Sequence, residues 1–296
     1  MSFIREFPSG SPSGSGDEAG RGSPVEMQDR VVGRFQRDAS AWDSLYERED
    51  VYALVHRLRQ RLALEWIDDL ATPPEARVLE IGCGAGHTSV ALGQRGFSVD
   101  AVDSTPAMLQ IARARVTEAR LSNVRLTMQD AHRLAYPDAT HDLVVALGVV
   151  PWLHSPGVAL AEMARVLKPG GHLLANSDNR ARLTHTFDPR NAPALEGARR
   201  ALKGLLKKAG RYRPPAKALA TMHRLEEFDS FLEDAGLVRI RAVTLGFGAF
   251  TFMGRRFLGD DKSVRLHHRL QARADKGKPI LKDRGNQYLV LAQKAG

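Results

Sequence analysis

The middle of the chain alternates between short apolar runs and segments with the period of a helix. Five apolar runs predict buried strands, at 78–81, 98–102, 124–128, 143–147 and 172–176. Segments with helical period separate several of them, at 87–94, 106–119 and 158–167. Strand and helix in alternation predict βαβ units, and therefore a parallel sheet with helices on its faces.

This alternation stops between 179 and 222 and then resumes. The next helix is expected at 225–235 and the next strand at 238–245, and a last strand is expected in the closing run "QYLVLAQK". Together with the five earlier strands, these predict a Rossmann-like α/β fold with seven mostly parallel strands. The interruption at 179–222 is read as an insertion into this fold.

The first quarter of the chain has a different composition and residue pattern. Residues 1–25 consist largely of Ser, Gly, Pro and charged residues, a composition that predicts a disordered tail. From 26 to 75 the pattern is helical, with apolar side chains such as Val55, Leu62 and Trp66 on one face. We therefore divide the chain into a tail at 1–25, an N-terminal helical segment at 26–75, and a main domain at 76–296.

Composition favours one cellular compartment but does not identify the binding partners. No apolar run approaches the length of a membrane span, the N-terminus has no signal-peptide pattern, and the single Cys83 excludes an internal disulfide. These features favour a cytoplasmic protein. The formal net charge of +9 suits RNA, an anionic membrane surface or an acidic substrate, and it equally suits an Arg-rich chain with no such partner.

The candidate chemistry starts at the stretch "RVLEIGCGAGHTSVAL". Gly82, Gly84 and Gly86 directly follow the first predicted strand, at the edge of a doubly wound sheet where ligands bind. A dinucleotide loop would read G-x-G-x-x-G, with its last glycine at position 87, but His87 stands there and the last glycine, Gly86, comes one residue early. A P-loop would continue with Gly-Lys-Ser or Gly-Lys-Thr, which is absent. The spacing therefore excludes both phosphate-binding loops.

Acidic residues complete this edge of the sheet. Asp103 ends the second strand and can accept hydrogen bonds from both hydroxyls of a ribose, and Asp130 follows the third strand and can accept from an exocyclic amine. Glu80 lies directly before the glycines. The set suits an adenosine that carries a cationic amino-acid tail and no pyrophosphate.

This pattern resembles the class I S-adenosylmethionine-dependent methyltransferases, in particular the ubiquinone-biosynthesis-like (methyltransferase type 11) branch. Four segments carry the resemblance in order: "VLEIGCGAG", "VDAVDST", "MQDA" and "ARVLKPGGHLL". The resemblance implies an enzyme that uses S-adenosyl-L-methionine as its cofactor. It also implies that the N-terminal helices form a lid and that the insertion at about 179–222 forms a cap.

The resemblance assigns cofactor contacts to particular residues. It implies that Asp103 holds the ribose, that Asp130 holds the adenine amine, and that the glycines lie under the methionine part. The full set of expected cofactor-binding residues is Glu80, Gly82, Gly84, Gly86, Asp103, Ser104, Met108, Asp130, Ala131 and Leu147.

The loop "GVVPWLHSPG" after the fourth strand faces the methyl group in this family. Trp152 stands where many relatives have a histidine, and His154 lies two residues later, which makes it the candidate general base. No cluster of His, Cys, Asp or Glu has the spacing of metal ligands, so no metal is expected. The predicted function is methyl transfer to a small organic acceptor. An oxygen is preferred to a nitrogen or a carbon as the atom that is methylated. A tRNA-modifying methyltransferase and a non-catalytic protein that binds the cofactor remain the alternatives.

The insertion contains a basic amphipathic helix at about 195–211. Its apolar stripe comprises Leu195, Ala198, Leu202, Leu205, Leu206 and Ala209, and its basic face comprises Arg199, Arg200, Lys203, Lys207 and Lys208. Such a helix can cover the substrate pocket or lie on an anionic membrane. We expect the first, with the stripe buried over the pocket, so peripheral membrane contact stays the alternative.

Overall fold

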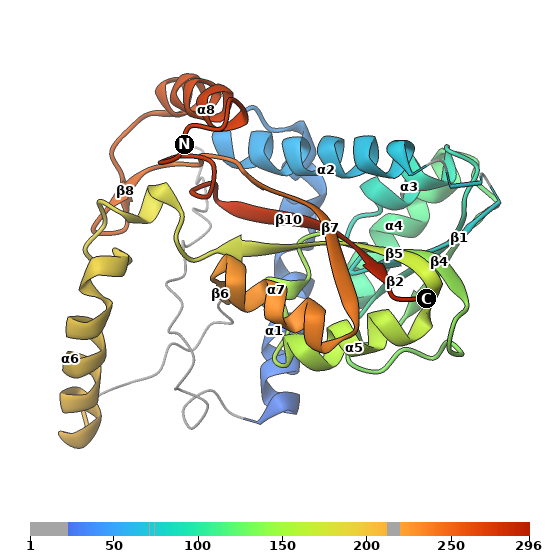
Figure 1. The fold of residues 1–296 in the computed structure, drawn as a ribbon, viewed down its shortest axis with the longest axis horizontal. Helices are drawn as coiled ribbons and strands as arrows, with labels where there is room; N and C mark the ends of the chain where they lie inside the picture. Colours follow the sequence, from blue (N-terminus) through green and yellow to red (C-terminus); the bar gives the residue numbers. More distant parts are fainter. Residues whose placement is uncertain (1–22, 71, 74, 212–219) are drawn as a thin grey trace.

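The computed structural model describes residues 23–70, 72–73, 75–211 and 220–296, and its centre is a mixed sheet (Figure 1). The strand order is β3-β2-β1-β4-β5-β10-β7, and a short strand, β6, pairs with the end of β5. The strands of this sheet are β1 (Arg77–Ile81), β2 (Ser98–Asp103), β3 (Val124–Met128), β4 (His141–Ala146), β5 (Leu167–Asn179), β6 (Met222–His223), β7 (Leu237–Leu245) and β10 (Gln287–Lys294).

The pairing confirms the predicted fold class. β1, β2, β3, β4 and β5 pair in parallel, while β10 runs antiparallel between β5 and β7. The seven predicted strands are all present, and β6 is an eighth strand in the described residues that the sequence pattern did not predict. The chain order reverses between β1 and β4, which creates the switch point at which α/β proteins bind ligands.

Helices cover both faces of the sheet, as the continuous apolar strands require. One buried cluster joins alternate strand residues, such as Leu79 and Val144, to helices α5 (Pro156–Val166) and α7 (Leu225–Asp234). The other cluster joins the intervening residues, such as Val78 and Val145, to helices on the opposite face. Those helices are α2 (Val51–Asp69), α3 (His87–Gly93) and α4 (Pro106–Glu118).

The N-terminal segment forms α1 (Pro24–Asp43), a short 3-10 turn (Ser44–Glu47) and α2. Ser23 caps α1 in a capping box with Glu26, so the helix begins inside the segment predicted as a tail. Residues 1–22 of that predicted tail lie outside the described residues. α1 lies against α4 and the end of β2, where the Ala107 N–H donates to Gln36 Oε1 at 3.1 Å.

Helix α8 (Asp260–Asp275) and the hairpin of β8 (Thr251–Phe252) and β9 (Arg255–Arg256) were not predicted. The buried face of α8 is mostly polar, which hides it from a search for apolar period. Its Gln271 Oε1 accepts from the Gly246 N–H at 2.8 Å, and its His267 Nδ1 accepts from the Phe247 N–H at 3.0 Å. Backbone donors at the end of β7 therefore hold this helix in place.

Helix α6 (Glu196–Lys208) corrects the prediction for the insertion. It stands away from the body of the molecule (Figure 1), and none of its residues is buried. Leu202 and Leu205 of the apolar stripe are 57% and 65% exposed. The stripe finds no apolar surface within the described chain, so the helix does not bury it over a pocket.

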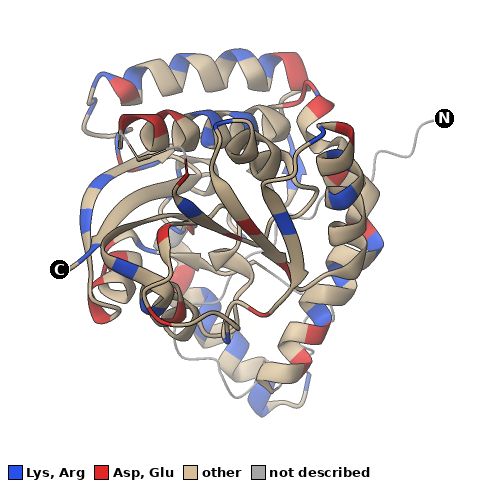
Figure 2. Ribbon diagram, turned by 90° about the vertical axis from the view of Figure 1, so that its right-hand side faces the viewer, with Lys and Arg blue, Asp and Glu red and all other residues tan. Residues whose placement is uncertain are grey.

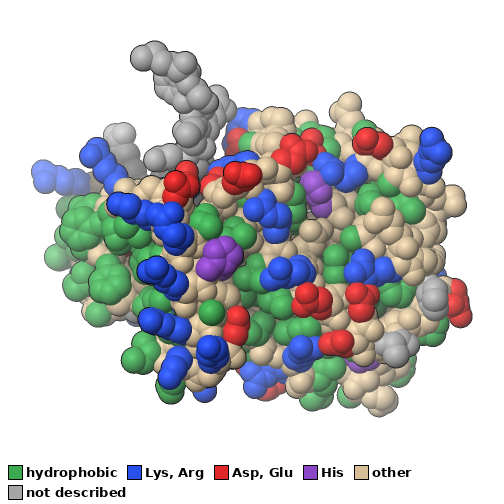
Figure 3. Space-filling model, turned by 90° about the horizontal axis from the view of Figure 1, so that it is seen from above, with side chains coloured by type: hydrophobic (Ala, Val, Ile, Leu, Met, Phe, Trp, Pro, Cys, Tyr) green, Lys and Arg blue, Asp and Glu red, His purple; other side chains and the backbone are tan. Residues whose placement is uncertain are grey.

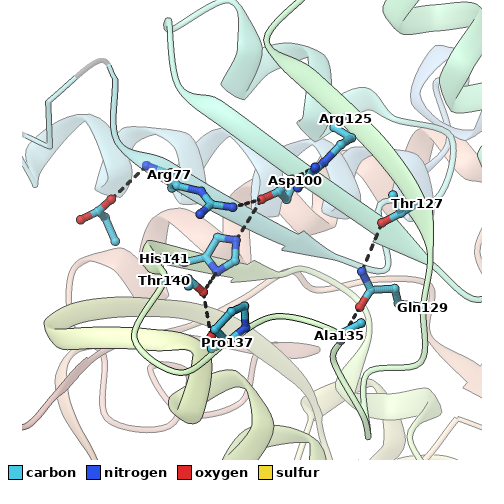
Figure 4. Close-up of polar contacts among 10 residues, drawn as sticks. Arg77, Asp100, Arg125, Thr127, Gln129, Ala135, Pro137, Thr140 and His141 are labelled. Atoms are coloured by element: carbon cyan, nitrogen blue, oxygen red, sulfur yellow. Dashed lines mark hydrogen bonds and ion pairs between the residues drawn. The ribbon is translucent and has the colours of Figure 1, made fainter.

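A charged cluster ties the amino-terminal ends of four neighbouring strands together (Figure 4). The buried Asp100 of β2 accepts hydrogen bonds from Arg77 of β1 at 2.9 Å, from Arg125 of β3 at 2.8 Å and from His141 of β4 at 3.1 Å. Burial alone would raise the pKa of Asp100, but these three donors hold it well below its usual range. The cluster lies at the opposite end of the strands from the glycine loop and therefore serves the sheet.

Candidate functional site

A cavity of about 560 Å³ opens at the carboxyl ends of the parallel strands. This volume lies within the usual range for small-molecule and cofactor sites. Nine of the ten predicted cofactor residues line it: Glu80, Gly82, Gly84, Asp103, Ser104, Met108, Asp130, Ala131 and Leu147. The fold therefore brings together residues that the sequence places at or after the ends of four different strands. Gly86 is the exception, and it has a different role.

The last two glycines of the loop have different structural roles. Both have positive φ angles, +52° at Gly84 and +81° at Gly86, a region that favours glycine. A Cβ at Gly84 would meet nothing within 4 Å, so this glycine leaves space open beside the cavity. A Cβ at Gly86 would lie 3.0 Å from the Cβ of Ala112, so this glycine lets the loop approach α4 closely.

Asp103 links the end of β2 to the glycine loop. Its Oδ2 accepts from the Gly84 N–H at 2.9 Å, and its Oδ1 accepts from the Thr105 N–H at 2.8 Å. Burial raises the pKa of Asp103 in spite of these donors. The Thr105 hydroxyl and the Ser104 backbone N–H also interact with this carboxylate. Its oxygens are hydrogen-bond acceptors at the wall of the cavity, where the hydroxyls of a ligand can replace such local donors.

Glu80 is buried at the end of β1, where the Ser89 hydroxyl donates to it. Burial raises the pKa of Glu80 to about 8, and the nearby Asp103 adds to the shift. A cation that entered the cavity beside Glu80 would favour its ionised form. The site therefore suits a ligand with a positively charged end.

Asp130 accepts from the backbone N–H of His132 at 2.9 Å and from its ring Nδ1 at 2.7 Å. The His132 ring stacks on His154, with centroids 3.7 Å apart. His154 is not among the residues that line the cavity, and its Nδ1 lies 2.9 Å from the Ser155 hydroxyl. The His154 ring thus supports the Asp130 loop from outside the cavity lining, and its role as a general base stays a prediction.

The N-terminal helices supply one wall of the cavity. Phe35 of α1 meets Trp152 of the loop after β4 edge to face, with centroids 5.1 Å apart, and Arg34 lies 4.8 Å above the same ring. Trp42 and Tyr46 also line the cavity. Aromatic and cation–π contacts thus hold α1 against the loop that faces the expected methyl group.

The far half of the cavity contains polar residues that the sequence reasoning missed. α2 contributes Tyr52, His56 and Arg59, which share one helix face because they are four and three residues apart. The end of β5 and the turn after it contribute Asp178, Arg182 and His185. Two signals were present in the sequence: polar residues within the apolar face of α2, and the polar run "NSDN" at the end of a buried strand.

The two buried histidines in this half are held neutral. Burial, together with a neighbouring arginine, lowers the pKa of His56 to about 3 and that of His185 to about 3. His56 Nδ1 donates to the Tyr52 carbonyl oxygen at 2.9 Å, and Arg182 Nε donates to His185 Nε2 at 2.9 Å. Groups with such low pKa values are poor general bases at neutral pH.

These observations fit S-adenosylmethionine, which supplies a methyl group on a sulfonium when bound. The open side of Gly84 leaves room for the ligand, and the carboxylate of Asp103 at the cavity wall provides acceptors for a ribose diol. The raised pKa of Glu80 shows a carboxyl group that a cationic ligand would ionise. Among the described residues, no group of three or more His, Cys, Asp or Glu side chains is arranged to hold a metal ion.

Comparison with known proteins places the chain in a family. A family model described as a methyltransferase domain matches residues 79–175. The ubiquinone biosynthesis O-methyltransferase of Hahella chejuensis is 31% identical over 62% of this chain and 73% of its own length. The chain therefore belongs to the class I S-adenosylmethionine-dependent methyltransferases, and it is an enzyme of that class. A second relative with the same description, from Acinetobacter baylyi, is 24% identical over 72% of this chain and 86% of its own length.

Solved structures agree on the fold. The magnesium protoporphyrin IX methyltransferase from Synechocystis PCC 6803, solved with bound S-adenosylhomocysteine, has a TM-score of 0.58 at 16% identity and covers 91% of this chain and 100% of its own. The [4+2]-cyclase SpnF has the same TM-score at 16% identity and covers 93% of this chain and 99% of its own. SpnF is described as a cyclase, so this fold alone does not determine the reaction.

Proposed function

We propose that this methyltransferase transfers the methyl group to an oxygen of a small organic acceptor. The observation that carries the proposal is the single cavity, in which the predicted cofactor residues share the lining with a polar pocket between α2 and the end of β5. Methyl transfer is an in-line displacement, so the protein must mainly align the acceptor oxygen, the methyl carbon and the sulfur. The curated relatives described as O-methyltransferases favour oxygen over nitrogen or carbon.

We further propose roles for the cofactor residues. Asp103 accepts from the ribose hydroxyls, Asp130 accepts from the adenine amine, and Glu80 faces the cationic amino-acid tail. Ser104, Met108 and Ala131 surround the adenine, Leu147 lies near the sulfur, and Gly86 acts indirectly through the packing of its loop. In the same proposal, residues 26–75 form the lid over the cofactor.

The insertion contributes to the acceptor pocket through its ends. Residues 178–191 and 220–222 include several that line the cavity, whereas α6 contributes none. The acceptor is therefore enclosed by β5, by the turn after it and by the lid. We assign no general base, since His154 lies outside the lining and the buried histidines inside it are held neutral.

The tRNA alternative has less support. Lys and Arg are interspersed with Asp and Glu over the face seen in Figure 2, rather than gathered in one stripe. RNA-binding surfaces usually concentrate basic residues. A non-catalytic cofactor-binding protein is a weaker alternative as well, because the glycine loop and Asp103 are intact. We place the protein in the cytoplasm, with Cys83 as a buried free thiol.

Methyl-labelled S-adenosylmethionine tests the proposal when it is offered with three kinds of acceptor. The acceptors are a water-soluble extract, a lipid-soluble extract and total tRNA. The proposal predicts label in small molecules of either extract, bound to oxygen. Label confined to tRNA would refute the small-molecule acceptor, and label on nitrogen or carbon would refute transfer to oxygen.

A further inference from the structure

Arg59 is a buried cation with an unsatisfied donor atom. Arg59 is only 5% exposed and lines the cavity. Its Nε has no hydrogen-bond partner among the described residues. A guanidinium group stays charged at any pH at which a protein is folded. Burial of such a charge without a partner is costly, and proteins normally pair it. The geometry therefore calls for an anion from outside the chain.

The surroundings of Arg59 are positive. The lining of the cavity includes five arginines: Arg34, Arg59, Arg182, Arg190 and Arg256. Of the acidic residues in the lining, Glu80, Asp103 and Asp130 lie on the side proposed for the cofactor. The remaining one, Asp178, lies 3.9 Å from Arg182 Nη1, and its buried carboxyl group has a raised pKa. This one carboxyl group interacts electrostatically with both Arg182 and Arg59, so two guanidinium groups share at most one negative charge.

The guanidinium of Arg59 also lies close to the expected place of methyl transfer. A Cβ on Gly148 would be 3.0 Å from Nη1 and 3.2 Å from Nη2 of Arg59, so the guanidinium lies over this glycine. Gly148 follows Leu147 directly, in the loop that we place near the sulfur. An anion bound to Arg59 would therefore lie beside the reacting methyl group.

We propose that the methyl acceptor is a carboxylate that Arg59 binds, so that the product is a methyl ester. This inference rests on the proposed function. One carboxylate oxygen accepts from the guanidinium, and the other attacks the methyl carbon. The new C–O bond forms as the C–S bond breaks, and the electron pair of that bond stays on sulfur. No proton moves in this step, because a carboxylate is already ionised at neutral pH.

This proposal explains the missing base. An alcohol must lose a proton during attack and benefits from a general base, whereas a carboxylate needs none. His56 and His185 line the cavity, but both are held neutral with pKa values of about 3. On the acceptor side, the cavity thus provides a cation to bind an anion, and its two histidines are poorly suited to remove a proton.

Binding of a simple probe tests the anion site without turnover. Protein saturated with S-adenosylhomocysteine is melted with benzoate or with the neutral, similarly shaped benzamide. Benzoate should raise the Tm of the wild type more than benzamide does, and Arg59→Gln should abolish the difference. Arg61→Gln is the matched control, since Arg61 lies on the same helix with its side chain 67% exposed. If Arg59→Gln fails to fold, Arg59→Lys is used, and it should reduce the difference because a compact ammonium group does not place its donors where the planar guanidinium does.

Equal stabilisation of the wild type by benzoate and benzamide would overturn the proposal, as would a benzoate effect that survives at Arg59→Gln. The label-transfer experiment gives a second test, because alkali releases the methyl group of an ester as methanol and leaves methyl ethers intact. Label that is stable to alkali would overturn the carboxylate acceptor and leave transfer to oxygen standing. Failure to bind S-adenosylmethionine would instead refute the proposed function itself.

A different observation carries a second inference, about the surface around α6. Hydrophobic side chains gather at the end of the molecule where β8 and α6 lie (Figures 1 and 3). The exposed apolar residues of the segments at this end, which we call the α6 patch, are Phe187, Leu195, Leu202, Leu205, Leu206, Phe252, Met253 and Phe257. Basic residues of α6 flank them, with Arg199, Arg200, Lys203, Lys207 and Lys208.

Hydrogen bonds connect the parts of this patch. Arg190 Nη1 donates to the Met253 carbonyl oxygen at 3.1 Å, and Arg199 Nη1 donates to the Ala192 carbonyl oxygen at 2.8 Å. The β8–β9 hairpin, the 187–192 turn and α6 thus adjoin one another. Arg190 also lines the cavity, so the patch borders the substrate site.

We propose that the α6 patch binds the surface of a membrane containing anionic lipids. An exposed leucine stripe with lysines and arginines beside it matches an interfacial helix, which inserts apolar side chains between acyl chains while cations meet the headgroups. A nucleic acid would use the cations and leave the leucines and phenylalanines in water. The charge and the apolar area together therefore favour lipid.

Sedimentation with vesicles tests this surface. The wild type should bind vesicles of phosphatidylcholine with phosphatidylglycerol and not vesicles of phosphatidylcholine alone. Leu202→Ser with Leu205→Ser should abolish binding, and so should Lys207→Glu with Lys208→Glu. Reversal of Lys262 on α8 to Glu is the control that should retain it.

Three results would overturn the membrane proposal. The first is absence of binding to the anionic vesicles. The second is self-association in solution that the leucine variant abolishes, since a second copy of the chain would then cover the patch. The third is tRNA binding that the charge variant abolishes while the leucine variant retains it.

Discussion

The replacement of Asp103 by asparagine changes one oxygen of the carboxylate and keeps its shape. In the wild type each oxygen already accepts one backbone N–H, from Gly84 at 2.9 Å and from Thr105 at 2.8 Å. The new amide must present its NH2 group to one of these donors. The variant therefore loses both the charge toward the ribose and one of the hydrogen bonds that shape the loop.

The expected cost follows from these contacts. A hydrogen bond to a charged group contributes about 1.5–3 kcal/mol, and an unsatisfied buried donor costs about 1–3 kcal/mol. We expect a net loss of about 1–3 kcal/mol in the binding of S-adenosylhomocysteine, which corresponds to a roughly 5- to 150-fold weaker Kd. Asp69→Asn, at an exposed carboxylate on α2, is the control and should leave Kd unchanged.

Calorimetric titration measures this loss, and an analogue identifies its cause. If Asp103 holds the ribose, the wild type should discriminate strongly against the 2′-deoxy analogue of S-adenosylhomocysteine, and Asp103→Asn should discriminate much less. A variant that bound S-adenosylhomocysteine as tightly as the wild type would refute the assignment. A loss of affinity with undiminished discrimination would show that Asp103 only shapes the glycine loop.

Three further predictions concern pH, stability and the glycine loop. Because the pKa of Glu80 is about 8 without ligand, a cationic ligand should expel its proton below that pH. Affinity for S-adenosylmethionine should then rise up to about pH 8, with proton release seen by calorimetry in two buffers, and Glu80→Gln should abolish the release. Asp100→Asn should lower the free energy of unfolding by about 1–3 kcal/mol at neutral pH. The pKa of Asp100 is depressed in the folded state, so this deficit should shrink as the pH falls below about 4, and a deficit that grew in acid would contradict the prediction. Gly84→Ala and Gly86→Ala should both lower Tm, because both place a Cβ at a positive φ. Gly86→Ala should lower it more, through contact with Ala112, and Gly84→Ala should weaken cofactor binding more; the reverse order in melting and titration would refute this division.

The sequence predicted those parts of the fold that obey a simple period. The central strands β1 and β4 were recognisable because they are buried on both faces, whereas the edge strands β3 and β7 are partly exposed. The glycine loop and Asp103 were recognisable because their position after a strand has chemical meaning. Helix α8 was missed because its buried face carries Ser263, His267 and Gln271, which no apolar period reveals. Tertiary hydrogen bonds hold that face in place, and they cannot be read from local pattern.

The acceptor side of the site was harder to predict. Arg59 and Asp178 are far apart in the sequence, and only the fold places both in one cavity. His154 drew attention through its position after Trp152, but the turn after β4 directs the histidine onto His132 instead. α6 was expected to bury its leucines because an isolated amphipathic helix is marginal in water. The alternative in the sequence analysis, a membrane surface outside the chain, agrees with the exposed stripe.

We expect the glycine loop to hold the cofactor with its sulfur facing Arg59. A crystal structure of the complex with S-adenosylhomocysteine and benzoate measures this most directly. We expect the ribose to lie on Asp103 and the sulfur to lie beside Gly148. One benzoate should contact both the sulfur region and the Arg59 guanidinium. A cofactor whose sulfur pointed away from Arg59, or a benzoate bound elsewhere in the cavity, would contradict it.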